Sequence, residues 1–168
     1  MPCETTSNCN GTSGLGGSGG TISKIGVKIL ASHPAVGVAL TSVSFRIYKA
    51  GSPTGSGYAK VYDSSGTLKG TSTTTVDWSL LPPTYPPSAE DASSWTFGSP
   101  VTLAAGDRIV IEGGFFNGSN EVNMCASIPT EYSYQCETFL QSSAWVDTTT
   151  SSSSWCWNEG DSPTGSDI

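Results

Sequence analysis

Charge is scarce in this chain of 168 residues. Only 12% of the residues are charged, and seven Lys and Arg stand against fourteen Asp and Glu, which gives a net charge of −7. The few cations form no run, and phosphate backbones repel an acidic surface, so we expect no nucleic-acid partner. Long apolar runs are also missing. No stretch approaches the roughly 20 apolar residues of a membrane span, and no signal-peptide core is visible, so any leader is expected to have been removed.

Histidine is nearly absent, and His33 is the single one. A serine triad would have to use it, but the chain contains no Gly-x-Ser-x-Gly elbow. One histidine beside cysteines that look paired does not give a tetrahedral zinc set either. Glu90 and Asp91 are adjacent acids, which are usually solvated, whereas a glycosidase needs two carboxylates that converge on one cleft. The sequence therefore predicts a protein that is not an enzyme and that needs no cofactor.

Calcium is a weak alternative, because loop carboxylates and backbone carbonyls can hold it in β-sandwiches. The candidates are Asp63, Asp107 and Glu112. The regular spacing of a calcium-binding loop is missing, and Asp107 and Glu112 are better explained as the end of a turn and as a solvent-facing acid. No metal is therefore expected.

Helical periodicity is absent over any useful length, whereas period-two alternation recurs along the chain. Ile25, Val27 and Ile29 alternate with Gly26 and Lys28, as expected for a strand with one buried face. Turn signals such as Ser-Pro-Thr-Gly at 52–55 and Asp-Ser-Ser-Gly at 63–66 separate many short strands of this kind. This pattern predicts an all-β protein with two antiparallel sheets packed as a sandwich over residues 21–160.

Two flanking segments differ from this domain in composition. Residues 1–20 are rich in Gly and Ser and contain only two large apolar residues, Met1 and Leu15, so we expect a flexible tail. Residues 161–168 form a second short tail.

Several segments together carry a resemblance to a known family. Their order and spacing resemble a jelly-roll sandwich module of prokaryotic cell-surface and secreted proteins. The resemblance implies a jelly-roll fold and an extracellular or cell-surface location, and some members look like carbohydrate-binding modules. The matching segments are KIGVKIL (24–30), LTSVSFRIYKAGSPTG (40–55), AKVYDSSG (59–66), VTLAAGDRIVIEGG (101–114) and SAWVD (143–147).

The five cysteines form two groups. The segments 121–128 and 134–140 read as a hairpin, and a simple register places Cys125 opposite Cys136. We therefore predict disulfides Cys125–Cys136 and Cys3–Cys9; the alternative is unpaired thiols in a reducing compartment. Cys156 is left over as a free thiol, or as the partner of its own copy across a two-fold axis.

Aromatic residues and sequons offer surface candidates. Trp155 and Trp157, with Tyr85, could stack on sugar rings, although packing in a core or interface explains the tryptophans more simply. Asn10 and Asn117 lie in glycosylation sequons within turn-like stretches, so we expect a glycoprotein.

Two functions remain open from the sequence alone. The first is a structural subunit of an extracellular filament or surface assembly, a homopolymer built through terminal segments and sheet edges, with donor-strand exchange as one route. Residues 22–30 would serve as a donor strand better than the Gly-rich tail, which makes the apolar side chains the expected assembly residues: Ile22, Ile25, Val27 and Ile29. The alternative is a carbohydrate-binding or adhesion module, with glycans as partners.

Overall fold

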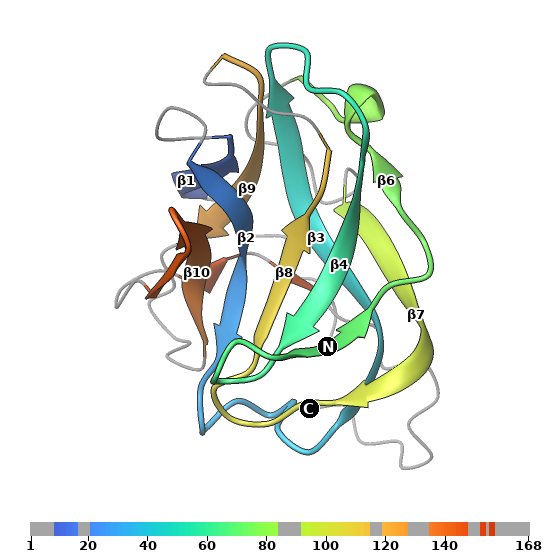
Figure 1. The fold of residues 1–168 in the computed structure, drawn as a ribbon, viewed down its shortest axis with the longest axis vertical. Coiled ribbons are helices and arrows are strands. Elements are labelled where there is room, and N and C mark those ends of the chain that lie inside the picture. Colours follow the sequence, from blue (N-terminus) through green and yellow to red (C-terminus); the bar gives the residue numbers. More distant parts are fainter. Residues whose placement is uncertain are drawn as a thin grey trace.

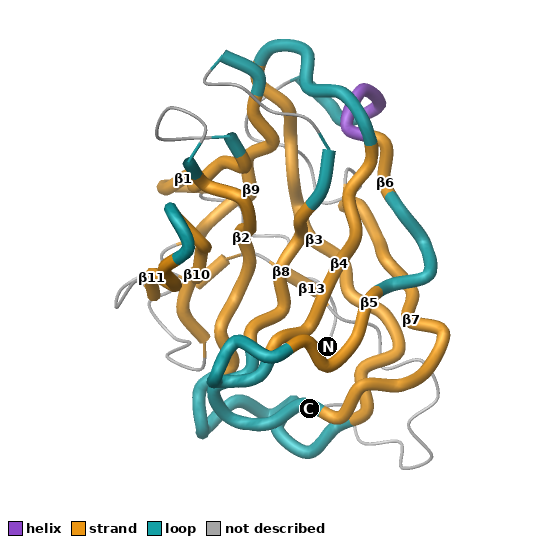
Figure 2. The backbone as a smooth tube through the Cα atoms, viewed as in Figure 1, coloured by secondary structure: helices purple, strands orange, loops and turns teal. Residues whose placement is uncertain are grey.

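Two antiparallel β-sheets pack face to face in a computed structural model of the chain, and their inner faces enclose the core (Figure 1). The predicted all-β sandwich is therefore confirmed. A single 3₁₀ turn, η1 (Trp78–Leu80), is the only helical element in the described part of the chain (Figure 2). The residues that the structure describes are 9–16, 21–83, 92–114, 119–127, 135–147, 152–153 and 155–156.

The first sheet begins at strand β1, an edge strand with few apolar residues. Its order is β1-β9-β3-β13, and β7 also pairs with β3. Two short segments, β12 and β13, pair with β9 and β3 respectively. The strands are β1 (Cys9–Leu15), β9 (Glu121–Ser127), β3 (Ala39–Ala50), β7 (Ala92–Thr102), β12 (Ser152–Ser153) and β13 (Trp155–Cys156).

The second sheet has the order β11-β10-β2-β8-β4-β5, and the two-residue β6 pairs with the start of β4. Neighbouring strands are mostly distant in sequence, so this sheet is held by long-range pairing. The strands are β11 (Ala144–Asp147), β10 (Gln135–Gln141), β2 (Ile22–Ile29), β8 (Arg108–Glu112), β4 (Ser56–Tyr62), β5 (Leu68–Thr71) and β6 (Val76–Asp77).

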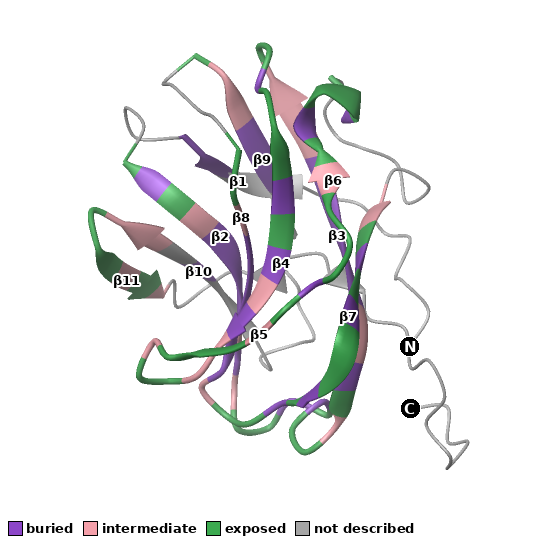
Figure 3. Ribbon diagram, turned by 45° about the vertical axis from the view of Figure 1, so that its right-hand side comes forward, coloured by how far each residue is buried: buried purple, intermediate pink, exposed green. Residues whose placement is uncertain are grey.

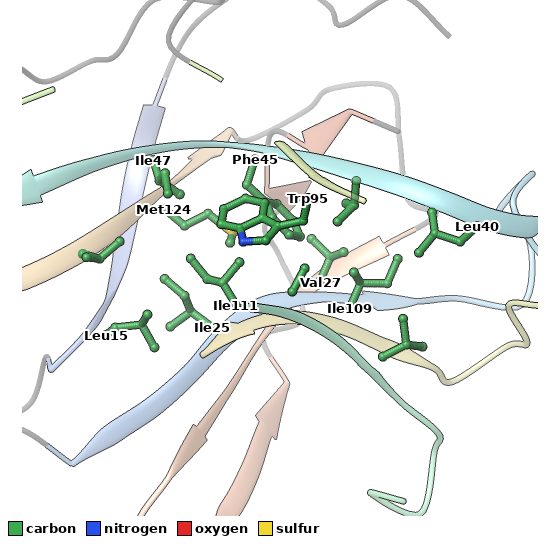
Figure 4. Packing of buried hydrophobic residues seen from close by; sticks show 14 of the residues in the cluster. Leu15, Ile25, Val27, Leu40, Phe45, Ile47, Trp95, Ile109, Ile111 and Met124 are labelled. Carbon is green, nitrogen blue, oxygen red and sulfur yellow. The ribbon is translucent and has the colours of Figure 1, made fainter. Parts of the chain in front are cut away.

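The apolar residues of the alternating strands also form the core. Ile25, Val27 and Ile29 of β2 are fully buried, and Phe45 and Ile47 of β3 meet them from the opposite sheet (Figure 4). Exposed and buried residues alternate along β4 and β7, as one-sided burial requires (Figure 3).

Two tryptophan side chains, Trp78 and Trp95, are buried in the core. Trp95 meets Phe45 and Trp78 edge to face, with ring centroids 6.0 and 6.4 Å apart, and its indole N–H donates to the carbonyl of Gly57 at 3.0 Å. The indole of Trp78 donates to the carbonyl of Gly113 at 2.9 Å. Burying an indole with its N–H paired avoids the cost of an unsatisfied donor.

Two sequence-based expectations differ from the structure. The segments 121–128 and 134–140 do not form a hairpin, because β9 and β10 lie in different sheets. The flexible tail predicted over 1–20 contains strand β1, since pairing with β9 supplies the order that its own sequence lacks. Local sequence carries little information about either feature, because both depend on long-range strand pairing.

Candidate assembly edge and charged outer face

Strand β1 forms one edge of the first sheet. It is antiparallel to β9, with Leu15 in register with Val122 and a register shift between Cys9 and Gly11, and no second strand partner exists for it within the described ranges. Its sequence, CNGTSGL, contains neither a charged residue nor proline. Charge and proline are two of the devices that protect a sheet edge from pairing with another chain, so this edge is weakly protected.

Leu15 is the anchor of this strand. Its side chain is fully buried in the core, at the end of the layer that contains Ile25 and Met124 (Figure 4). Burying one leucine stabilises a strand by only about 1.5–3 kcal/mol. β1 is therefore held by a backbone ladder and one large apolar side chain.

Glycines surround the anchor for steric reasons. A Cβ added at Gly14 would lie 2.4 Å from Oδ1 of Asn123, the residue opposite it on β9. Gly16 has a φ of 85°, and its N–H donates to the carbonyl of Ile22 at 2.9 Å. The connection to β2 then reads Gly-Ser-Gly-Gly at 17–20.

The predicted donor strand is placed differently. Ile22, Ile25, Val27 and Ile29 lie in β2, which is hydrogen-bonded to β8 on one side and to β10 on the other. All four side chains are in the core. Donating β2 to another copy would open two ladders and remove four core side chains, whereas releasing β1 opens one ladder and removes one core side chain, Leu15, so β1 is the segment better suited to exchange.

A second feature is a charged cluster on the outer face of the second sheet. Glu112 of β8 accepts hydrogen bonds from Lys24 of β2, from Lys60 of β4 and, at 2.8 Å, from the hydroxyl of Tyr62. Burial alone would raise the pKa of Glu112, but these hydrogen bonds outweigh it, so the pKa lies below its ordinary value. The Tyr62 pKa is raised to about 12 by burial and by its bond to Glu112.

A second carboxylate organises the neighbouring part of this face. Asp147 of β11 pairs with Lys28 at 2.7 Å and with Arg108 Nη2 at 3.0 Å, and it accepts from the hydroxyl of Thr138 at 2.7 Å. Burial would raise the pKa of Asp147, but the bonds from Arg108, Lys28 and Thr138 lower it to about 2. Both carboxylates therefore stay ionised at neutral pH, where a general acid would need a raised pKa.

The hairpin of β10 and β11 folds over this face. Trp145 of β11 contacts Tyr62 of β4 with ring centroids 5.6 Å apart, although three strands separate β11 from β4 in the sheet. Arg108 lies over the ring of Trp145 at 4.9 Å. Val110 and Thr138, on the outer side of the sheet, are consequently buried. We call this arrangement of Tyr62, Trp145 and the two carboxylate clusters the clasp.

The sequence holds a signal for the clasp, although no catalytic or metal-binding pattern points to it. Residues 24 and 28, 60 and 62, and 108 and 112 are the polar positions of three alternating strands, so each pair shares the outer face. The order β2-β8-β4, which brings the pairs together, is a tertiary property.

The clasp makes stability depend on acid pH. The folded-state pKa of Asp147, about 2, lies below its ordinary value of 3.8, so its contribution is complete above pH 3.8 and disappears as pH falls through 2. We expect Asp147→Asn to lower the free energy of unfolding at pH 6 and to converge on the unmodified chain near pH 2. Denaturant unfolding across this range measures it; a deficit that stays constant down to pH 2 would contradict the assignment.

The predicted calcium candidates do not converge. Asp63 caps its own turn by accepting from the N–H groups of Ser65 and Thr67, Asp107 pairs with Lys69, and Glu112 belongs to the clasp. Across the described residues, no group of three or more potential metal ligands exists.

The remaining predicted residues fall partly outside the described part. Cys9 and Asn10 lie in β1, Cys125 in β9 and Cys136 in β10, but their side chains are outside it. The hairpin that motivated Cys125–Cys136 is absent, and that disulfide stays a prediction. Trp155 and Cys156 form β13, where Trp155 is in register with the core residue Phe45. The residues wholly outside the described ranges are Cys3, Tyr85, Asn117 and Trp157.

No helix in the described residues is long and apolar enough to cross a membrane. Comparison of the chain with protein-family models, with curated proteins and with solved structures gave no match.

Proposed function

We propose that this protein is a structural subunit of an extracellular homopolymer, and that the copies join by exchanging strand β1. The observation that carries the proposal is the placement of β1 as an uncharged edge strand, anchored by Leu15 and connected through Gly-Ser-Gly-Gly at 17–20. Exchange costs little free energy, because the ladder and the packing broken within one chain are remade between two chains. The donor and the acceptor meet head to tail, and such interfaces build open filaments when they do not close into rings.

The strand order supports an assembly fold. We infer that the sandwich is a jelly roll: β1-β9-β3-β7 faces β2-β8-β4-β5, and the chain passes from one sheet to the other at most connections. β10 and β11 then extend the second sheet beyond β2. Jelly rolls occur in capsid shells and in lectins. Low charge and abundant Ser and Thr favour the extracellular location.

Carbohydrate binding has less support as an alternative. Sugar stacking needs aromatic faces that are open to the solvent, but Lys24 lies 5.1 Å over the ring of Tyr62, and Arg108 covers Trp145. The aromatic pair of Tyr62 and Trp145 is used inside the clasp, whereas Tyr58 on the same face of β4 is 42% exposed. A glycan array probed with the purified chain tests this alternative.

Assembly is tested on the full chain. We expect filaments by electron microscopy at high protein concentration, and we expect Leu15→Ser to abolish them, because the exchanged strand loses its anchor. Leu15→Met is the matched control, since it keeps an apolar side chain of similar volume. Dispersed monomers of the unmodified chain at every concentration, measured by light scattering, would refute the proposal.

A further inference from the structure

We infer that the edge of β9 that β1 occupies is a sequence-selective acceptor, which recognises the tripeptide Gly14-Leu15-Gly16 in a strand donated by a second copy. The inference rests on the proposed function and adds the rule by which the partner strand is recognised. Backbone ladders alone accept any extended strand, so selectivity must come from the side-chain positions.

The first element of the rule is exclusion at position 14. Gly14 is buried opposite Asn123, and its missing Cβ would lie 2.4 Å from Oδ1 and 3.3 Å from Cγ of that side chain. Asn123 is itself only 6% exposed, and Oε2 of Glu121 would lie 3.2 Å from the same Cβ. A donor with any side chain at this position must displace a buried amide.

The second element is a place for one apolar side chain. Leu15 is completely buried next to Val122, its partner in register, and it belongs to the same cluster as Met124. A polar residue there would leave an unpaired polar group in the core, which is unfavourable.

The third element is the exit of the donor. Gly16 has a φ of 85°, a region that residues with a Cβ seldom adopt, and its N–H donates to the carbonyl of Ile22. The chain turns away from the acceptor at this residue. The three positions together set the register, because a shift by one residue would place Leu15 against Asn123 and Gly16, which has no side chain, against Val122.

The occupant is a second copy of this chain, since each copy carries both the tripeptide and the edge that fits it. The same complementarity operates within one chain when β1 folds back. Whether β1 stays in its own chain or joins another depends on the protein concentration, while the acceptor recognises the same three residues in both cases.

A cut form of the full chain measures the selectivity. A protease site replaces residues 17–20, and the chain is folded before it is cut. After cleavage, the β1 peptide is held only by non-covalent contacts. Fluorescent peptides of sequence 9–16 then compete with it for the edge of β9. Every peptide carries Cys9→Ser, so that thiol chemistry does not contribute. Fluorescence anisotropy gives the affinity of each peptide.

We expect the native peptide to bind and Leu15→Met to stay within about threefold of it. Leu15→Ser should bind about 10- to 100-fold more weakly, as the loss of a buried leucine requires. Gly14→Ala should bind at least about tenfold more weakly, and Asn123→Ala in the chain should restore it, because that change removes Oδ1, which would lie only 2.4 Å from the added Cβ. On the intact chain, the melting temperature of Gly14→Ala should fall, and adding Asn123→Ala should recover it.

Equal affinity for all the peptides, or no binding of the native peptide, would overturn the inference, as would a Gly14→Ala defect that Asn123→Ala leaves unchanged. The two proposals fail separately. Selective peptides with a chain that never polymerises refute the proposed function alone. Filaments together with unselective peptides refute the acceptor rule alone.

Discussion

Replacing Trp95 by alanine is expected to lower the free energy of unfolding by about 4 kcal/mol. The indole is fully buried, donates to the Gly57 carbonyl and packs edge to face on Phe45 and Trp78. Alanine leaves a cavity, removes both aromatic interactions and leaves the Gly57 carbonyl without its hydrogen bond from the indole. A domain of this size is stable by only about 5–15 kcal/mol, so the loss is a large part of the total.

Chemical denaturation with tryptophan fluorescence measures this change, because four other tryptophans remain as reporters. Trp95→Phe is the control: it keeps the aromatic packing but not the indole donor, and we expect a smaller loss. A decrease below about 1.5 kcal/mol for alanine would mean that the two sheets do not pack around this ring.

Gly26→Ala is expected to cost about 3 kcal/mol, an unusually large effect for adding one methyl group. A Cβ at this position would lie 2.0 Å from the backbone oxygen of Ile109 and 2.6 Å from Cα of Val110. Both are backbone atoms of β8, so relief requires β2 and β8 to separate at the centre of the sheet.

The same denaturation experiment tests this prediction. Ser23→Ala, at an exposed position of the same strand, should stay within about 0.5 kcal/mol of the unmodified chain. If the two variants lose similar stability, the close approach of β2 to β8 is wrong.

The sequence contains the strands but little of their arrangement. In KIGVKIL the apolar and polar positions alternate, and both the strand and its buried face follow from that pattern. The turns at Gly55 and Gly66 are likewise local, and both glycines have the positive φ that such turns need. Local periodicity is sufficient in these cases because each strand has one buried face.

Strand β1 shows where local information ends. Only Leu15 in CNGTSGL is large and apolar, so no alternation marks it as a strand, and its order comes from the ladder with β9. The clasp likewise depends on the pairing of strands that are distant in sequence. Lys24, Lys60 and Glu112 meet only because β8 lies between β2 and β4, a neighbourhood that the sequence of no single strand contains.

The exchange of β1 is most directly tested by a disulfide that can form only between two chains. Gly14 and Asn123 are opposite in register, at a separation that suits a disulfide. One variant carries Gly14→Cys and a second carries Asn123→Cys, and the two are mixed, assembled and oxidised. The Gly14→Cys strand clashes with Asn123 of its own chain and fits the shortened side chain of the other variant. A chain with both substitutions controls for the chemistry. We predict peptides linked between positions 14 and 123 in the mixture, detected by mass spectrometry. If the control forms the link and the mixture does not, β1 remains in its own chain and the account is contradicted.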